Sequence, residues 1–240
     1  MNEVPVVRGL NVLRDAAEAP SLLGTSASPV RDRVRTEALR IARDEALVEA
    51  AYSYRIVPFD APLAATMHAG GETLHAPRLL SPSGRLTALA CAVCTLGPRI
   101  EERVRLLFAE RRASLAMVLD ELANAWLFEV SRRVQDRMHA DVIRQGLSMA
   151  GELRPGDPGL ALEAQPAVLR LVGAEALGVR VNERMLMQPH KSTSMVLGVG
   201  MDLPPTEWSR CDECRNRATC RAAARVEAQK ATGSRTPTGV

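Results

Sequence analysis

Blocks of apolar and polar residues along the first half of the chain predict a helix followed by two strands. Residues 30–51 are rich in Arg, Glu, Ala and Leu and contain no Gly or Pro, which favours a helix with a charged outer face. Residues 52–58 switch to strand-forming types. Residues 86–96 are a nearly continuous apolar run that ends at Gly97 and Pro98, as expected of a strand buried on both faces.

A helical spacing of apolar residues follows this buried strand. Pro98 occupies a first helical position, and Glu101 and Glu102 lie where the N-terminal helix dipole favours acidic side chains. Apolar residues then recur every three or four positions in two segments. The spacing predicts two packed helices, the second running to about His139.

The last third of the chain mixes turns with shorter elements. Residues 151–159 are a turn-rich joint, and 162–172 predict a helix that tolerates Pro166 only in its first turn. Apolar and polar residues alternate from 179 to 188, and strand character resumes at 195–199. These strands predict a hairpin whose connecting loop is 189–194.

The two ends of the chain are expected to be irregular. Residues 1–29 predict an arm with at most one short element, and 222–240 form a small, polar tail that we expect to be disordered. Between them, 30–221 is predicted to be a single domain that includes the C-terminal cysteines.

Composition narrows the class of protein. The 46% hydrophobic content is enough for a sizeable core, and a net charge of +3 directs the chain neither to nucleic acid nor to an anionic membrane. No apolar run approaches the roughly 20 residues that span a bilayer, and the N-terminus lacks the features of a signal peptide. The expected location is therefore the cytoplasm. Five cysteines, an odd number, suit a reducing compartment without disulfides.

Two short segments carry candidate ligand-binding residues. The loop 189–194 holds Lys191, Ser192 and Ser194, which suit a carboxylate or phosphate through charge-assisted hydrogen bonds. A solvated turn is the alternative. In the second segment, Arg154-Pro155-Gly156-Asp157, the glycine lets backbone approach a ligand, and the two opposite charges suit a zwitterion. A plain loop between helices is the alternative there.

A third group is a set of closely spaced cysteines. Cys211, Cys214 and Cys220 have a spacing that suits zinc or an iron-sulfur cluster, with free thiols as the alternative. A fourth ligand would come from elsewhere, such as His190 or Cys91, unless a cluster keeps an open iron position. Cys91 and Cys94, by contrast, lie inside the predicted buried strand and are interpreted as small hydrophobes that point to opposite faces.

The order of these short motifs resembles the activation, or reactivation, domain of cobalamin-dependent methionine synthase in its short stand-alone form. The resemblance covers roughly residues 30–221, and it is carried by Thr95-Leu96-Gly97, Pro155-Gly156, Leu162-Glu-Ala-Gln165, Leu177-Gly178-Val179, Met187-x-Pro189-x-Lys191-Ser192-x-Ser194 with Gly198, Cys211-x2-Cys214 and Cys220-Arg221. It implies an α+β fold in which a twisted, mostly antiparallel sheet is flanked by helices.

The resemblance also implies a function. Such a domain binds S-adenosylmethionine and supplies the methyl group that returns an oxidised cobalamin to methylcobalamin after a one-electron reduction. A stand-alone copy would do this in trans for a corrinoid-dependent methyltransferase, as at most an accessory part of methionine synthase activity. The implied site has Arg154, Pro155, Gly156 and Asp157 on one wall, with Lys191, Ser192 and Ser194 on the other. An iron-sulfur cluster on the C-terminal cysteines could pass the electron.

The chain departs from the family pattern at the first wall. Asp157 stands where the family has a tyrosine, and Arg154 directly precedes Pro155 instead of lying three residues before it. A second hypothesis is therefore a metal-stabilised interaction scaffold that has lost ligand binding. A third, a zinc-dependent nucleic-acid binder, is the weakest because aromatic residues make up only 3% of the chain.

Overall fold

The computed structural model describes residues 4–13, 29–61, 64–81 and 83–206. Contacts divide the chain into Met1–Pro204 and Pro205–Val240, and the fold below is that of the first unit. The predicted cysteine cluster and the predicted tail at 222–240 lie outside the described residues. Within the described residues, no helix is long and apolar enough to cross a membrane.

A five-stranded antiparallel sheet forms the centre of this unit, in the order β1-β2-β5-β9-β6. Its strands are β1 (Val6–Arg8), β2 (Ala51–Pro58), β5 (Arg85–Thr95), β9 (Ser192–Met201) and β6 (Ser148–Leu153). The predicted strands at 52–58 and 86–96 are confirmed as β2 and β5. The edge strand β6 was not predicted, because its sequence, Ser-Met-Ala-Gly-Glu-Leu, shows no clear alternation and only Leu153 is buried.

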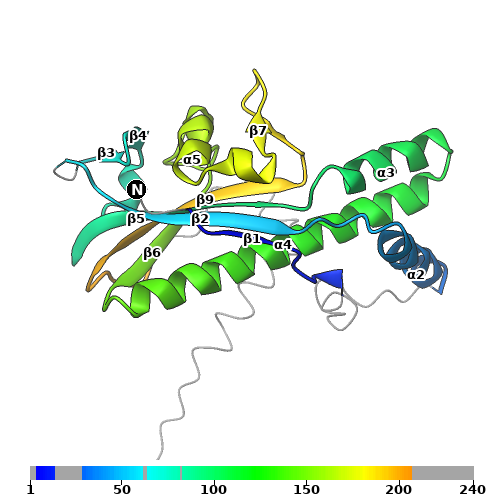
Figure 1. The fold of residues 1–240 in the computed structure, drawn as a ribbon, viewed down its shortest axis with the longest axis horizontal. Coiled ribbons are helices and arrows are strands. Elements are labelled where there is room, and N and C mark those ends of the chain that lie inside the picture. The colour runs from blue at the N-terminus through cyan, green and yellow to red at the C-terminus, as the bar shows by residue number, and fades with distance from the viewer. Residues whose placement is uncertain (1–3, 14–28, 62–63, 82, 207–240) are drawn as a thin grey trace, which may run out of the picture. The chain divides into compact units, whose positions relative to one another are not determined.

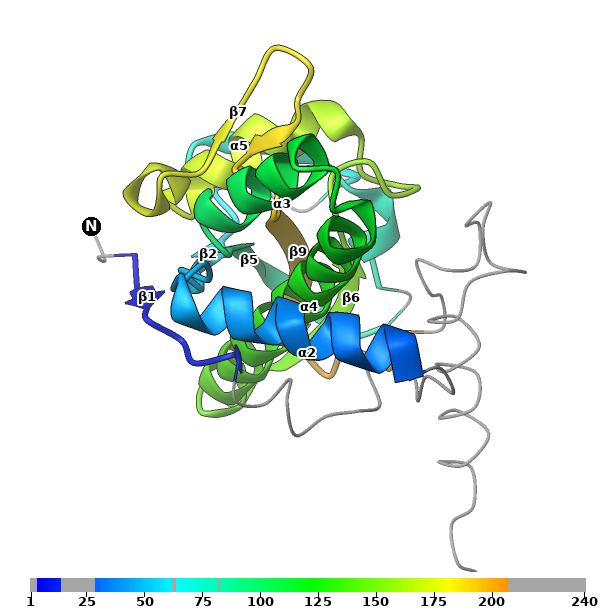
Figure 2. The ribbon, with the colours of Figure 1, turned by 90° about the vertical axis from the view of Figure 1, so that its right-hand side faces the viewer.

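The long helix α4 (Ala113–Ile143) covers one face of the sheet, as Figure 1 shows. Its apolar side packs on strand residues that share that face, among them Tyr54, Ala90 and Met195. Helices α2 (Pro29–Asp44) and α3 (Arg99–Ala109) pack against α4, and Figure 2 views this end of the unit. The two predicted helices after Pro98 are thus confirmed as α3 and α4, and α4 ends four residues beyond His139.

The opposite face of the sheet is covered by α5 (Gln165–Leu171) and the short elements around it (Figure 1). Val168, Leu171 and Val172 are buried there. The helix predicted at 162–172 is confirmed, with Pro166 in its first turn. The short elements on either side of α5 in the sequence are β3 (Thr66–Ala69), β4 (Glu72–His75), η1 (Pro77–Leu79), η2 (Leu162–Ala164), η3 (Ala174–Leu177), β7 (Arg180–Val181) and β8 (Met187–Gln188).

The prediction of a hairpin whose loop is 189–194 is wrong. The hairpin in this region is formed by β7 and β8, and the side chain of Asn182 caps its turn by accepting hydrogen bonds from the backbone N–H groups of Arg184 and Leu186. Residues 192–194 instead begin β9, between β5 and β6. Their hydroxyls suggested a turn, but each is buried and bonded to a partner that the local sequence does not reveal.

Glycine fixes two close approaches in the sheet. Gly97, after β5, has a φ of +77°, and a Cβ there would lie 2.5 Å from Glu49 Oε2. Gly200 of β9 lies so close to β5 that a Cβ would meet the carbonyl oxygen of Arg85 at 2.1 Å.

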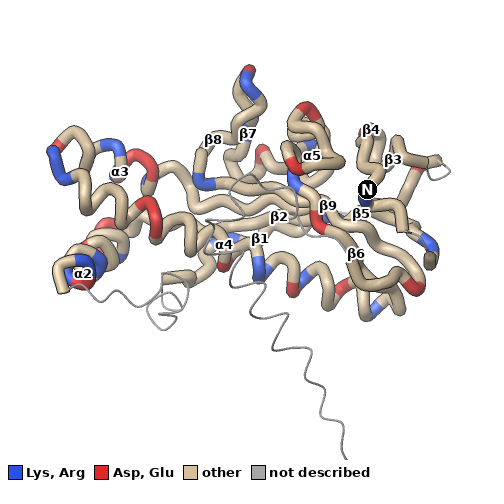
Figure 3. The backbone as a smooth tube through the Cα atoms, turned by 180° about the vertical axis from the view of Figure 1, so that it is seen from behind, with Lys and Arg blue, Asp and Glu red and all other residues tan. Residues whose placement is uncertain are grey.

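The charged residues are distributed mainly over the helices and connections, and β9 carries none (Figure 3). The sheet interior is therefore tightly packed and uncharged.

Candidate ligand site

Lys191 lies just before β9 and is held against α4. Its Nζ is 2.7 Å from Asp120 Oδ1 and donates a hydrogen bond to Asn124 Oδ1 at 2.8 Å. The Lys191 side chain is only 14% exposed. The predicted anion-binding ammonium therefore has two partners on the helix, and both lie one helical turn apart on the same side of α4.

Arg154 reaches the same side of the sheet from the end of β6. Its Nη1 donates to Thr193 Oγ1 at 3.0 Å, and its Nη2 donates to Ser131 Oγ on α4 at 3.3 Å. The guanidinium carbon also lies 5.9 Å from the ring centroid of Phe128. Because side chains alternate along a strand, Lys191 and Thr193 share the face of the sheet that α4 covers. The structure thus brings Arg154 and Lys191 to one side, along one helix.

A bulge in β6 directs the chain toward this position. Ala150 pairs with Gly198 and Leu153 pairs with Val196, so β6 uses one residue more than β9 over this stretch. Gly151, with a φ of +70°, supplies the left-handed conformation that such a bulge needs. Bulges bend a strand and turn its side chains, which positions Arg154 to cross β9 and reach α4.

The loop after Arg154 is a compact turn closed by its own hydrogen bonds. Asp157 Oδ2 accepts from the Arg154 backbone N–H, and the Asp157 N–H donates back to the Arg154 carbonyl, both at 2.8 Å. Gly156 donates to the carbonyl of Leu160 at 2.9 Å and has a φ of +98°. This positive φ, rather than any lack of space, requires glycine beside Pro155.

Ser192 and Ser194 lie on the other face of the sheet. Ser192 Oγ donates to Thr95 Oγ1 at 2.9 Å, and Ser194 Oγ accepts from Gln165 Nε2 at 2.8 Å. All four side chains are buried. The predicted wall of Lys191, Ser192 and Ser194 is therefore split between two faces, because these residues begin a strand with a two-residue period.

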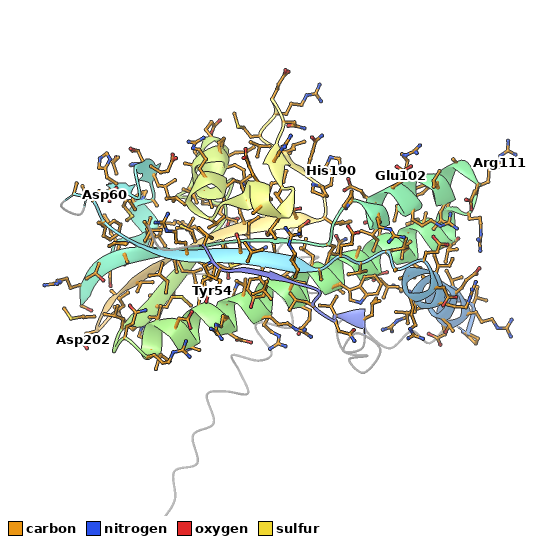
Figure 4. All side chains as sticks on the ribbon, viewed as in Figure 1. Tyr54, Asp60, Glu102, Arg111, His190 and Asp202 are labelled. Atoms are coloured by element: carbon orange, nitrogen blue, oxygen red, sulfur yellow. The ribbon has the colours of Figure 1, made fainter. Side chains whose placement is uncertain are left out.

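The two residues that could supply a fourth metal ligand, Cys91 and His190, both lie in the described part of the chain. Cys91 is fully buried in the middle of the sheet, and burial raises the pKa of its thiol to about 12, so the thiolate that binds metals is disfavoured. His190 lies beside the start of α3 (Figure 4), where Glu101 accepts a hydrogen bond from its backbone N–H. The described residues contain no cluster of three or more His, Cys, Asp or Glu side chains that could hold a metal. The predicted cysteine ligands, Cys211, Cys214 and Cys220, lie outside them.

Sequence reasoning missed several residues of this region. Glu152 binds Arg154, and a row on α4 faces the two cations: Asp120, Asn124, Phe128 and Ser131. The available signal was the spacing of this row, which at intervals of three and four residues lies along one side of the helix.

An open groove adjoins Lys191. It has a volume of about 700 Å³ and lies between α2, α3 and α4. Asp120 and Asn124, the two partners of Lys191, are part of its lining, with these other residues: Val30, Arg31, Val34, Val104, Phe108, Ser114, Met117, Val118 and Glu121. The Lys191 contacts therefore form part of one end of a cavity of small-molecule size.

The sheet order and the long helix that covers one face of the sheet define an α+β fold. The fold is similar to the crystal structure of the MetH reactivation domain bound to AdoHcy, with a TM-score of 0.62 and 12% sequence identity. The match covers 99% of this chain and 91% of that chain. No family model and no curated protein matches the sequence. The predicted fold class is confirmed by the structural likeness.

Proposed function

We propose that this chain binds S-adenosylmethionine and assists the reductive remethylation of a corrinoid-dependent methyltransferase in trans. The observation that carries the proposal is the placement of Arg154 and Lys191 against successive turns of α4, in a fold similar to a domain solved with AdoHcy. The two residues are far apart in the sequence, with 36 residues between them, and the fold brings them to the same helix.

The proposed ligand site combines three kinds of group. The turn at Pro155-Gly156 presents backbone with little side chain in the way. Asp157 and Lys191 supply opposite charges for a zwitterion. Phe128, which is 59% exposed, offers an apolar ring beside the Arg154 guanidinium. Such a ring suits the flat base of an adenosine.

The proposed reaction transfers a methyl group to the cobalamin of the partner protein. A one-electron reductant converts the oxidised cobalt to its nucleophilic state. The cobalt then attacks the methyl carbon, a cobalt-carbon bond forms, and the carbon-sulfur bond breaks with its electron pair left on sulfur. We propose the predicted cysteine cluster, Cys211, Cys214 and Cys220, as one source of this electron.

Calorimetric titration of the full chain with S-adenosylmethionine tests ligand binding. We expect saturable heat, and we expect Lys191→Met to weaken binding by about tenfold, equivalent to 1.4 kcal/mol. Arg132→Gln is the control, because Arg132 is an exposed cation on α4 that pairs with Glu129 and Asp136 of the same helix. Absence of heat from the unaltered chain would contradict ligand binding.

A reactivation assay tests the role in trans. A cobalamin-dependent methyltransferase that lacks its own activation domain is oxidised, then mixed with S-adenosylmethionine, a low-potential one-electron donor and this chain. We expect the absorption spectrum of methylcobalamin to appear only when the chain is present. Recovery at the same rate without the chain would rule out this role.

A further inference from the structure

Large apolar side chains gather in the open around the groove between α2, α3 and α4. Val30 of α2 is 67% exposed, Phe108 of α3 is 50% exposed and Met117 of α4 is 64% exposed. All three line the groove, and we call them its rim. Single exposed apolar residues are ordinary on a protein surface, whereas several that border one cavity mark an interaction surface.

The floor of the groove is apolar as well. Val34, Val104 and Val118 come from the same three helices, and they belong to the hydrophobic core or pack against it. Helices α2 and α3 each pack on α4, and Figure 2 shows α3 above α2 at this end of the unit. The groove is therefore an apolar recess between helices, bordered by apolar protrusions.

The charged residues of the groove lining are paired within the chain. Arg31 Nη2 of α2 lies 3.1 Å from Glu121 Oε2 of α4, and both side chains are 44% exposed. Asp120, the third charged residue of the lining, is paired with Lys191. Because these two pairs carry no net charge, a second copy of the chain is not repelled, and neither a polyanion nor a strongly cationic partner is favoured.

The opposite charges lie on different helices, which suits a symmetric contact. In an isologous dimer the same surface of each copy faces the other across a two-fold axis. With that axis along the groove, α2 of one copy lies over α3 and α4 of the second copy. Arg31 of one copy then approaches the acidic Asp120 and Glu121 of the second copy and not its own kind. Such a contact is complementary in charge.

We propose that this groove is the contact surface of a symmetric homodimer, in which the rim of each copy packs over the floor of the other. A second copy accounts for rim and floor at once, because both belong to one surface. A small molecule would fill the recess and leave the rim in water. The dimer also covers one side of Asp120 and Asn124, which hold Lys191. It is independent of the proposed function, because it needs neither S-adenosylmethionine nor a corrinoid.

Sedimentation velocity of the full chain tests the dimer. A reducing agent in the buffer prevents the five cysteines from cross-linking copies. We expect the weight-average mass to approach twice the 26.0 kDa of the chain as the concentration rises to about 100 μM. Met117→Glu and Val30→Glu each place a carboxylate in the contact, and we expect each to raise the dissociation constant by about tenfold or more. Ile143→Glu is the control, because Ile143 is 54% exposed at the far end of the same helix α4.

Each outcome decides for or against the groove as a dimer contact. Loss of the dimer in the two groove variants alone supports the proposal. A chain that stays monomeric at every concentration overturns it. A dimer that both groove variants leave intact overturns it as well, and so does one that Ile143→Glu weakens equally. Circular dichroism checks that each variant keeps the fold, and if one groove variant does not, the other variant and the unaltered chain still decide.

Discussion

Gln165 at the start of α5 donates a hydrogen bond of 2.8 Å to Ser194 of β9, and both side chains are buried. This bond links the helix on one face of the sheet to the strand whose other face lies against α4. A hydroxyl that the sequence suggested for ligand binding thus satisfies a buried amide.

Ser194→Ala should destabilise the fold by about 1–3 kcal/mol, because it leaves the Gln165 amide buried without its partner. Urea unfolding followed by circular dichroism gives the free energy of unfolding. The double variant Ser194→Ala with Gln165→Leu should recover most of the loss, since both partners are then apolar. A loss from Ser194→Ala that the second change leaves unaltered would show that this bond does not explain the effect.

Gly200→Ala should be strongly destabilising, by about 3 kcal/mol or more. The added Cβ would meet the backbone oxygen of Arg85, which cannot rotate away as a side chain would. Gly71→Ala is the comparison, because that position has open space and only a φ of +79° to resist the change. The comparison variant should lose roughly 1–2 kcal/mol. Thermal unfolding of both variants measures the difference, and equal losses would contradict the close approach of β9 and β5.

The two tyrosines should titrate above the ordinary pKa of about 10. Burial raises the pKa of Tyr52 and of Tyr54, and for Tyr54 the hydrogen bond to Asp141 raises the pKa further. Figure 4 shows Tyr54 on the α4 side of the sheet. Since Tyr52 and Tyr54 are the only tyrosines in the chain, tyrosinate absorbance reports on them alone.

The stability that accompanies these tyrosine shifts has a defined pH range. A raised pKa in the folded state means that folding favours the protonated phenol, so this contribution is present below about pH 10 and is lost as the pH rises above it. Absorbance titrations of the folded chain and of the chain in denaturant should therefore have different midpoints, with the folded one higher. Coinciding midpoints would contradict the burial of both rings.

Cys91 and Cys94 should resist alkylation in the folded protein. Both thiols are buried, and burial raises the pKa of each to about 12, so little thiolate exists near neutral pH and reagents cannot reach it. Mass spectrometry after treatment with iodoacetamide identifies which cysteines are modified. We expect Cys91 and Cys94 to react only after unfolding in guanidinium, and rapid labelling of either one at neutral pH would contradict their placement.

Long periodic segments of the fold were predictable, whereas the elements that build the candidate site were less so. The apolar run of β5 and the helical spacing of α4 determine their own structure because each segment buries a continuous face. The edge strand β6 gives no such signal, since its residues are half-buried and a bulge interrupts its alternation. Ser192 to Ser194 were interpreted as a turn because their hydroxyls bond partners, such as Thr95 and Gln165, that only the folded sheet brings near.

The candidate site shows the same limit. Arg154 and Lys191 were identified from residue type, and their shared side of the sheet follows from strand pairing that no local motif encodes. Glu152 was not singled out, because a carboxylate two positions from an arginine is common and acquires meaning only through the bulge that turns both toward α4. That Glu152 engages the guanidinium of Arg154 is visible only in the three-dimensional contacts.

The alternation along β9 restricts how this part of the chain can change in length. Lys191 and Thr193 face α4, whereas Ser192 and Ser194 face the other side. Deleting a single residue between Lys191 and Ser194 would move Lys191 to the other face, placing its ammonium among the buried hydroxyl partners and His190 opposite Asp120. Related sequences that keep this site should therefore differ here by substitution or by pairs of residues, and seldom by one.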